Sequence, residues 1–286
     1  MLNPKLTLSE HSTTTLLKVA TALFLLVFLT FVAVSGGGPD SAGAASTKRV
    51  TLGKGNMKLT PNCGRDFERD CVVEGKVTGY QALSKKVEGR NFVVPFKGKV
   101  VSWSISLAKV TRKPVKVDEN LTPEPAQLPF FNETFGSPSQ ARISVLREVN
   151  KREKGPPQYK NVRQSPTQIL NPYFGTTVTF PLTKPLNVNK GQTIGLTIPT
   201  WAPALWKPRV CNDAVVKDPN CVPYERNYTW RASRGPDYCE LGFEENGDPN
   251  AALKKSHSQQ KVDSVKRYGC YYGGNVLLYT ATIVGK

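Results

Sequence analysis

Residues Val100–Leu107 alternate apolar and polar side chains, and this alternation constrains the fold more than any other feature of the chain. Val101, Trp103, Ile105 and Leu107 are separated from one another by single serines. Because successive side chains of a β-strand point to opposite faces, the pattern predicts a strand with one face in a packed core and the other in water. Half-buried strands of this kind are typical of antiparallel sheets, and we expect Trp103 to be a core residue.

Several other short segments have strand character and are separated by Pro and Gly. Strands are predicted over residues 72–80, 141–149, 176–182, 193–199 and 275–284. Inward positions are expected at Val73, Val77, Ile143, Val145, Val149, Ile194, Leu196, Ile198, Val276 and Leu278. The chain contains 22 prolines, which oppose long helices. Repeated short strands predict an all-β domain, specifically an antiparallel β-sandwich with a jelly-roll-like topology.

Two stretches interrupt this rhythm. Residues 111–138 contain five prolines and little apolar periodicity, so a long loop between two strands is predicted there. Residues 203–272 form a cysteine-rich and aromatic insertion in the same domain. Long loops without secondary structure usually carry function or are disordered. The cysteines expected to form bridges argue against disorder, and we therefore look for a site in the insertion.

The N-terminal region carries an apolar run without charges, Val19–Val34, that follows Lys18. Residues 1–35 are therefore expected to be a hydrophobic helix, serving either as a signal peptide or as a transmembrane anchor over residues 16–35. Residues 36–62 are predicted to be a flexible linker, and residues 63–286 a single domain. Both alternatives for the apolar run place this domain outside the cytoplasm, secreted or anchored to the cell membrane.

The charge of the chain is strongly basic, with 39 Lys and Arg against 22 Asp and Glu and a net charge of +17. Two basic and two acidic residues precede Lys48, so the excess belongs to the downstream domain. Such a charge attracts polyanions, including wall polymers and anionic membrane surfaces. The basic residues are scattered along the sequence, which also fits a dispersed charge that only keeps an exported protein in solution.

Six cysteines all follow the apolar run, at Cys63, Cys71, Cys211, Cys221, Cys239 and Cys270. An even number in an exported chain predicts three disulfides, and neighbours in sequence are the expected pairs: Cys63–Cys71, Cys211–Cys221 and Cys239–Cys270. The spacing lacks the close cysteine pairs and nearby histidines of a zinc site, and no metal or other cofactor is predicted.

Between residues 92 and 200 the order of the segments resembles a known group of proteins. The segments are Val94–Trp103, Ala141–Arg147, Val162–Ser165, Thr179–Leu182 and Val188–Leu196. They resemble exported, largely actinobacterial β-sandwich proteins of unassigned function, in which Asp often stands where this chain has Gln192. The resemblance implies a jelly-roll-like sandwich, and it implies no catalytic residue.

Aromatic residues concentrate in the insertion and provide the candidate ligand-binding residues. These are Trp206, Tyr224, Tyr228, Trp230 and Tyr238. Sugar rings stack on flat aromatic faces, and Tyr and Trp also suit protein recognition surfaces. The alternative is that these rings pack around the disulfides as a small satellite core.

Enzymatic chemistry has weaker support. Glu240, Glu244, Glu245 and Asp248 cluster in the insertion, and two facing carboxylates would suffice for glycoside hydrolysis. His257 is the one histidine after the apolar run and lies in a polar, basic stretch without a recognisable nucleophile partner. The acidic run Asp66–Asp70 lacks the ligand-bearing turn of a calcium site.

These observations predict a non-enzymatic, extracytoplasmic binding or structural domain. The expected partner is an anionic or carbohydrate component of the cell envelope, such as a wall polymer, a glycan or an anionic membrane surface. Export and disulfides argue against nucleic acid as the partner. The alternative is an extracytoplasmic hydrolase that uses carboxylates around Glu240–Asp248. The sequence leaves the oligomeric state open.

Overall fold

A computed structural model describes the chain from residue 47 to residue 285 with several gaps. The described residues are 47–61, 73–83, 92–114, 126–149, 154–206, 209–210, 221–222, 228–235, 239 and 259–285. They belong to one compact unit. The predicted N-terminal hydrophobic helix, residues 1–35, lies outside them. Among the residues described, no helix is both long and apolar enough to cross a lipid bilayer.

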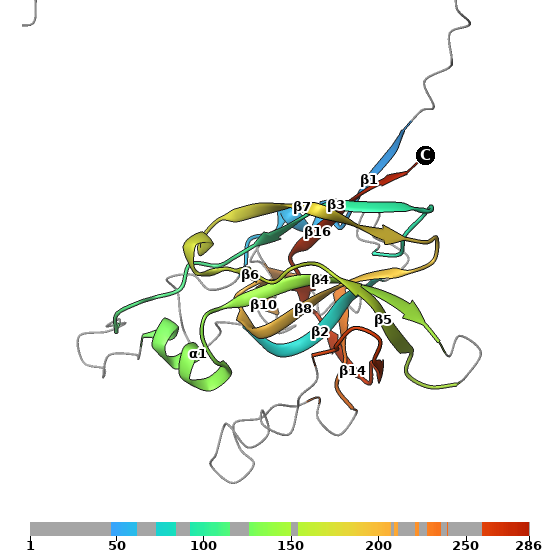
Figure 1. Cartoon of the computed structure of the whole chain (residues 1–286). Helices are drawn as coiled ribbons and strands as arrows, with labels where there is room; N and C mark the ends of the chain where they lie inside the picture. The colour runs from blue at the N-terminus through green and yellow to red at the C-terminus, as the bar shows by residue number, and fades with distance from the viewer. Residues whose placement is uncertain are drawn as a thin grey trace, which may run out of the picture. The chain divides into compact units, whose positions relative to one another are not determined.

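The described residues form mostly antiparallel β-sheets, as the alternation of the sequence predicts. One sheet has four strands in the order β1–β16–β3–β7. Its strands are β1 (Lys48–Leu52), β16 (Tyr279–Gly285), β3 (Gly98–Ser106) and β7 (Thr177–Val188). Figure 1 shows β3, β7 and β16 on one side of the domain and β4, β8 and β2 on the other.

The larger sheet has eight described strands in the order β13–β5–β4–β8–β2–β12–β14, with β6 paired to β4. Its strands are β13 (Val265–Arg267), β5 (Gln158–Gln164), β4 (Gln140–Glu148), β8 (Thr193–Ala202), β2 (Glu74–Leu83), β12 (Tyr228–Ala232), β14 (Cys270–Gly273) and β6 (Gln168–Ile169). Two short pairs complete the set: β9 (Leu205–Trp206) with β15 (Val276–Leu277), and β10 (Arg209–Val210) with β11 (Cys221–Val222).

Inward side chains of both sheets meet in one hydrophobic core. Trp103 of β3 is fully buried and packs on Phe180 of β7, with ring centroids 4.8 Å apart. Ile143, Ile194 and other predicted inward residues of the larger sheet belong to the same cluster. The prediction that Trp103 is a core residue of a β domain is confirmed.

Bulges account for two errors in the predicted inward positions. In β3 the buried valine is Val100, whereas Val101 is half-buried, because the pairing with β7 shifts between Val100 and Ser102. In β4 the pairing with β5 shifts after Val145, and Val149, which directly follows this strand, is 45% exposed. A bulge inserts one extra residue, so strict alternation assigns the positions beyond it to the wrong face.

Residues 48–58, predicted to be linker, are structured. Strand β1 pairs with β16 from Lys48↔Gly285 to Leu52↔Ala281, and a 3-10 helix (η1) follows over Lys54–Lys58. Only Leu52 of β1 is buried. Because the other positions of this strand need not be apolar, its composition is polar and basic, like that of a linker. Its strand conformation depends on a partner more than 200 residues away, which local composition does not reveal.

Helix α1 (Gln127–Phe135) replaces part of the loop predicted over residues 111–138. Thr111 caps it from outside: the Thr111 hydroxyl accepts from the Gln127 N–H at 3.1 Å, and Gln127 Oε1 accepts from the Thr111 N–H at 2.9 Å. The helix packs Phe131 on Trp201, with ring centroids 5.1 Å apart. Pro129 falls in the first turn, where helices tolerate proline, so the loop prediction was wrong there.

A second 3-10 helix, η2 (Asn171–Tyr173), leads into β7. Strand β7 forms an edge of the four-stranded sheet and contains Pro181, Pro185 and Lys184. Prolines and lysines on an edge strand oppose pairing with another chain, because proline donates no hydrogen bond and lysine must stay hydrated.

Candidate functional site

The predicted aromatic ligand residues are spread over several parts of the structure. Trp230 of β12 is 1% exposed and stacks on Tyr272, with ring centroids 4.4 Å apart. Trp206 is half-buried in β9, where it pairs with Val276. The backbone of Tyr228 begins β12, and Tyr224 and Tyr238 lie outside the described residues. The indole ring of Trp230 is therefore part of the main hydrophobic core, in the same cluster as Cys270.

One of the three predicted disulfides lies within the described residues. Cys239 and Cys270 are bonded, with their Cα atoms 4.9 Å apart, so this pairing is confirmed. The bond connects Cys239 to β14 within the insertion, and Cys270 of this strand is fully buried. The pairings Cys63–Cys71 and Cys211–Cys221 involve side chains outside the described set and stay predictions.

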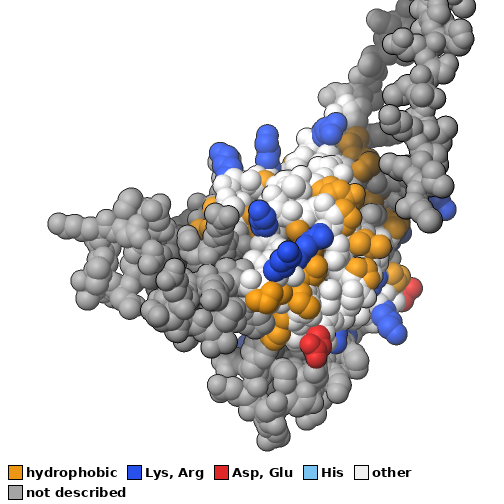
Figure 2. Space-filling view, turned by 90° about the vertical axis from the view of Figure 1, so that its left-hand side faces the viewer, with side chains coloured by type: hydrophobic (Ala, Val, Ile, Leu, Met, Phe, Trp, Pro, Cys, Tyr) orange, Lys and Arg blue, Asp and Glu red, His pale blue; other side chains and the backbone are white. Residues whose placement is uncertain are grey.

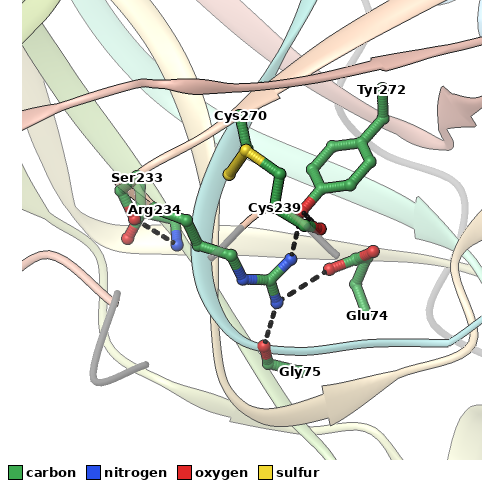
Figure 3. A network of polar contacts seen from close by, with 8 residues as sticks. Glu74, Gly75, Ser233, Arg234, Cys239, Cys270 and Tyr272 are labelled. Atoms are coloured by element: carbon green, nitrogen blue, oxygen red, sulfur yellow. Dashed lines mark hydrogen bonds and ion pairs between the residues drawn. A yellow bond between two sulfur atoms is a disulfide. The ribbon is translucent and has the colours of Figure 1, made fainter. Parts of the chain in front are cut away.

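Next to this disulfide lies a buried ionic network (Figure 3). The Arg234 side chain is 3% exposed, and its Nη2 lies 3.4 Å from Glu74 Oε2. Nη2 also donates to the Gly75 carbonyl at 3.0 Å, and Nη1 donates to the Tyr272 hydroxyl at 2.9 Å. Tyr272 in turn donates to the Cys239 carbonyl at 2.7 Å. The network thus ties the start of β2 to the disulfide.

Burial dominates the electrostatics of this network. It raises the pKa of Glu74 to about 7, although the Arg234 guanidinium acts in the opposite direction. Burial likewise raises the pKa of Tyr272. The described contacts of the Arg234 side chain are all made within the protein, to Glu74, Gly75 and Tyr272, so the network acts as a structural staple of the insertion.

The outer surface of the four-stranded sheet carries in-register rows of hydroxyl groups, which we call the hydroxyl face. Its members alternate with buried core residues and are Thr51, Ser102, Ser104, Ser106, Thr177, Thr179, Thr280 and Thr282. Three hydrogen bonds connect neighbouring strands: Ser104–Thr179 at 2.8 Å, Thr177–Ser106 at 3.0 Å and Thr51–Thr282 at 3.1 Å. Thr280 and Thr282 of β16 and Ser106 of β3 are buried, so the accessible part consists mainly of the other hydroxyls on β3 and β7.

Every charged residue on these four strands is basic. The strands contain Lys48, Arg49, Lys99 and Lys184 and have neither Asp nor Glu. Arg49 and Lys99 both pair with Val284, one row beyond Thr282, so they border the hydroxyl face at one end. Elsewhere the basic side chains are distributed, as Figure 2 shows for one face of the molecule. The hydroxyl face therefore combines neutral hydrogen-bonding groups with a positive margin.

The larger sheet also has hydroxyl groups on its outer surface, but these are covered. Thr197 Oγ1 lies 2.8 Å from Thr78 Oγ1 and 2.6 Å from Ser144 Oγ, and all three residues are fully buried. Gln164 Nε2 donates to Ser144 Oγ at 3.0 Å. We call this group the covered face.

Gln260 is the centre of the segment that covers it. The Gln260 N–H donates to Thr78 Oγ1 at 2.8 Å, and its side-chain Nε2 donates to the carbonyls of Tyr159 and Ser264 at 2.7 and 2.8 Å. The Tyr268 hydroxyl donates to Gln260 Oε1 at 2.8 Å. Gln260 is fully buried, so this part of the insertion serves as a structural lid on the sheet.

Beside the covered face lies a pocket of about 280 Å³, which we call the tyrosine pocket. It is lined by Tyr80, Gln81, Ala82, Phe92, Val93, Tyr159 and Thr193. Tyr159 donates to the Tyr80 hydroxyl at 3.3 Å. Burial raises the pKa of Tyr80 and of Tyr159, so both hydroxyls stay protonated and neutral at physiological pH.

The residues considered for catalysis and metal binding lie elsewhere in the chain. Glu240, Glu244, Glu245, Asp248, His257 and the run Asp66–Asp70 are outside the described residues. Within the described part, no three His, Cys, Asp or Glu side chains gather in a metal-binding arrangement.

Sequence reasoning found the strand of the hydroxyl face but missed the face itself. The alternating serines of β3 and the threonines Thr177 and Thr179 are visible signals. The alignment of these side chains across the sheet cannot be seen in the sequence. Strands β3 and β7 are about 75 residues apart, and their register comes from tertiary pairing. Comparison with known proteins adds no relative: no family model, no curated protein and no solved structure matches this chain.

Proposed function

We propose that this protein is a non-enzymatic binding domain that acts outside the cytoplasm and recognises an anionic carbohydrate polymer of the cell envelope. The observation that carries the proposal is the hydroxyl face, with in-register Ser and Thr side chains, basic residues at its border and no carboxylate on its four strands. Hydroxyls donate and accept hydrogen bonds, as sugar hydroxyls do, and Lys and Arg attract carboxylate or phosphate groups.

Several features support an extracytoplasmic location. The Cys239–Cys270 disulfide is typical of oxidising compartments, and the apolar run Val19–Val34 resembles a signal or anchor. We further propose that the two sheets form a jelly-roll-like sandwich, in line with the resemblance to exported actinobacterial β-sandwich proteins. Architectures of this kind present sheet faces and loops to ligands.

A binding assay with matched variants tests the proposal. The full chain is titrated with an anionic wall polysaccharide, with a neutral polysaccharide and with anionic lipid vesicles. The double variant Arg49→Gln/Lys99→Gln should weaken binding to the anionic polysaccharide about tenfold, since each exposed charge contact contributes up to about 1 kcal/mol. Ser104→Ala/Thr179→Val should weaken it severalfold without changing its salt dependence.

The control is Lys261→Gln/Arg267→Gln, which removes the same charge from exposed positions outside the four strands. If both double variants weaken binding equally, the interaction depends on net charge alone and the proposed face is wrong. Preferential binding to vesicles would replace the polysaccharide with a membrane surface. Release of new chain ends, abolished by Glu244→Gln, would instead support the hydrolase alternative.

A further inference from the structure

A second group of side chains on the outer surface of the larger sheet has the composition of a ligand site. Tyr271 of β14, Arg231 of β12 and Tyr80 of β2 are neighbours in one row of the sheet. Trp230 and Tyr272, the adjacent residues on these strands, pack into the core. Arg231 and Tyr271 therefore point to the opposite, outer side, and we call these two residues the Arg231–Tyr271 platform.

The platform is held in a defined geometry. The Arg231 Cζ lies 5.1 Å from the centroid of the Tyr271 ring, and Arg231 Nη1 donates to the Tyr268 carbonyl at 3.3 Å. The Thr229 hydroxyl donates to the Tyr271 hydroxyl at 3.1 Å. These contacts fix both side chains from below, while the Tyr271 ring stays 54% exposed.

Arg231 differs from Arg234, which is three residues away. Arg234 is buried against Glu74, whereas no carboxylate among the described residues forms an ion pair with Arg231. A guanidinium group has five N–H donors, and the Tyr268 carbonyl uses one of them. The remaining donors suit a carboxylate, which a guanidinium binds through two parallel hydrogen bonds.

The tyrosine pocket continues the platform, since Tyr80 belongs to the pocket and pairs with Arg231. The pocket combines apolar groups of Phe92 and Val93 with hydroxyl groups of Tyr159 and Thr193. Its volume of about 280 Å³ is just below the range of about 300–1,000 Å³ for small-molecule sites, which limits it to a group of about one ring.

A positive and a negative charge both act on the tyrosine hydroxyls of this pocket. Arg231, on β12, and Glu148, on β4, both act electrostatically on the hydroxyls of Tyr80 and Tyr159, with opposite signs. The carboxylate of an acidic ligand would face Arg231, which is the neighbour of Tyr80 in the sheet.

We propose that the Arg231–Tyr271 platform and the tyrosine pocket bind one acidic sugar ring, with its carboxylate on the Arg231 guanidinium and its apolar ring face against Tyr271. Sugar rings pack their C–H groups on exposed aromatic rings, and an ionised hydrogen bond is about twice as strong as a neutral one. The site belongs to the larger sheet and stands on observations independent of the hydroxyl face.

Titration of the full chain with glucuronate tests the site, followed by changes of amide NMR signals, with glucose as the matched neutral ring. We expect saturable binding of glucuronate and at least tenfold weaker binding of glucose. Arg231→Gln should abolish the preference for glucuronate, and Tyr271→Ala should weaken binding about fivefold while Tyr271→Phe preserves it. Ala82→Leu, which narrows the pocket without touching the guanidinium, should weaken binding of both sugars.

Two outcomes would overturn the site: equal binding of glucuronate and glucose, or unchanged glucuronate binding in Arg231→Gln. Arg49→Gln/Lys99→Gln should leave glucuronate binding unchanged, so this control separates the failure of the site from failure of the hydroxyl face. If Arg231→Gln does not fold, Ala82→Leu and Tyr271→Ala decide the question.

Discussion

The two sheets carry hydroxyl groups on their outer surfaces and use them differently. On the covered face, Thr78, Ser144 and Thr197 bond to one another and to a lid centred on Gln260, and all four residues are buried. On the hydroxyl face, Ser104 and Thr179 pair across strands in an exposed environment. Thr and Ser in a strand are thus structural or available for binding depending on what packs over them.

The difference has an energetic basis. A buried hydroxyl that loses its partner costs about 1–3 kcal/mol, because no water replaces the lost hydrogen bond. An exposed hydroxyl exchanges its partner with water at little cost. Mutations on the covered face should therefore affect folding, and mutations on the hydroxyl face should affect binding.

The largest effect is expected for Gln260→Leu, which removes the centre of the lid. The substitution removes the Gln260 hydrogen bonds to the carbonyls of Tyr159 and Ser264 and from the Tyr268 hydroxyl, and the Ser264 carbonyl keeps the Asn161 N–H at 3.1 Å. We expect the free energy of unfolding to fall by about 3–5 kcal/mol, measured by urea titration.

Gln259→Leu is the control for this prediction, because the neighbouring glutamine accepts one bond, from Arg142 at 3.4 Å. The Gln259→Leu substitution should lower the free energy of unfolding by less than about 1 kcal/mol. Similar costs for both variants would show that the lid does not depend on the Gln260 side chain, and the distinction between the two faces would weaken.

A pH dependence of stability should come from the larger sheet, since the strands of the hydroxyl face have no carboxylate. Burial raises the pKa of Glu74 from 4.5 to about 7, so between these values the folded state binds a proton more tightly than the unfolded state. The free energy of unfolding should therefore fall as pH rises from about 4.5 to about 7, by on the order of 2 kcal/mol.

Glu74→Gln should flatten this part of the pH profile in urea titrations at a series of pH values. Glu133→Gln, at an exposed position on α1, serves as the control and should leave the slope in place. A slope that persists in Glu74→Gln would assign the proton uptake to another group.

The smallest effects come from a matched pair of isosteric substitutions, one on each face. Thr197→Val removes a hydroxyl bonded to both Thr78 and Ser144 and should lower the free energy of unfolding by about 1–2 kcal/mol. Thr179→Val removes a hydroxyl bonded to Ser104 in an exposed position and should change it by at most about 0.5 kcal/mol. If chemical denaturation shows that both substitutions lower the free energy of unfolding equally, the distinction between the covered face and the hydroxyl face is wrong.

Much of the interior was predictable from residue patterns. Trp103, Ile143 and Ile194 are core residues because period-two alternation is a property of the strand itself. The Cys239–Cys270 bond also agreed with the pairing of neighbours in sequence. The errors lie where a distant partner decides: β1 requires β16, and α1 requires Thr111 to cap Gln127.

The candidate sites, too, could be predicted only in part from the sequence. The aromatic residues of the insertion were visible in the sequence, yet composition does not separate Trp230, which is buried, from Tyr271, which is exposed. Arg231 and Arg234 have the same chemistry and are three residues apart, but among the carboxylates that the structure describes, a buried ion-pair partner is found for Arg234 alone. Burial of a side chain depends on what the rest of the chain places over it, and local patterns do not contain this information.

The sequence by itself determined that this protein is a basic chain with short antiparallel strands, a core around Trp103 and cysteines placed for disulfides. Each of these follows from local periodicity, composition or spacing, which act over a few residues. Only the tertiary structure decided which hydroxyls are covered, which arginine is paired and which tyrosine is exposed. Those outcomes depend on strand register and on contacts between residues far apart in the chain, because packing is what exchanges water for protein around each side chain.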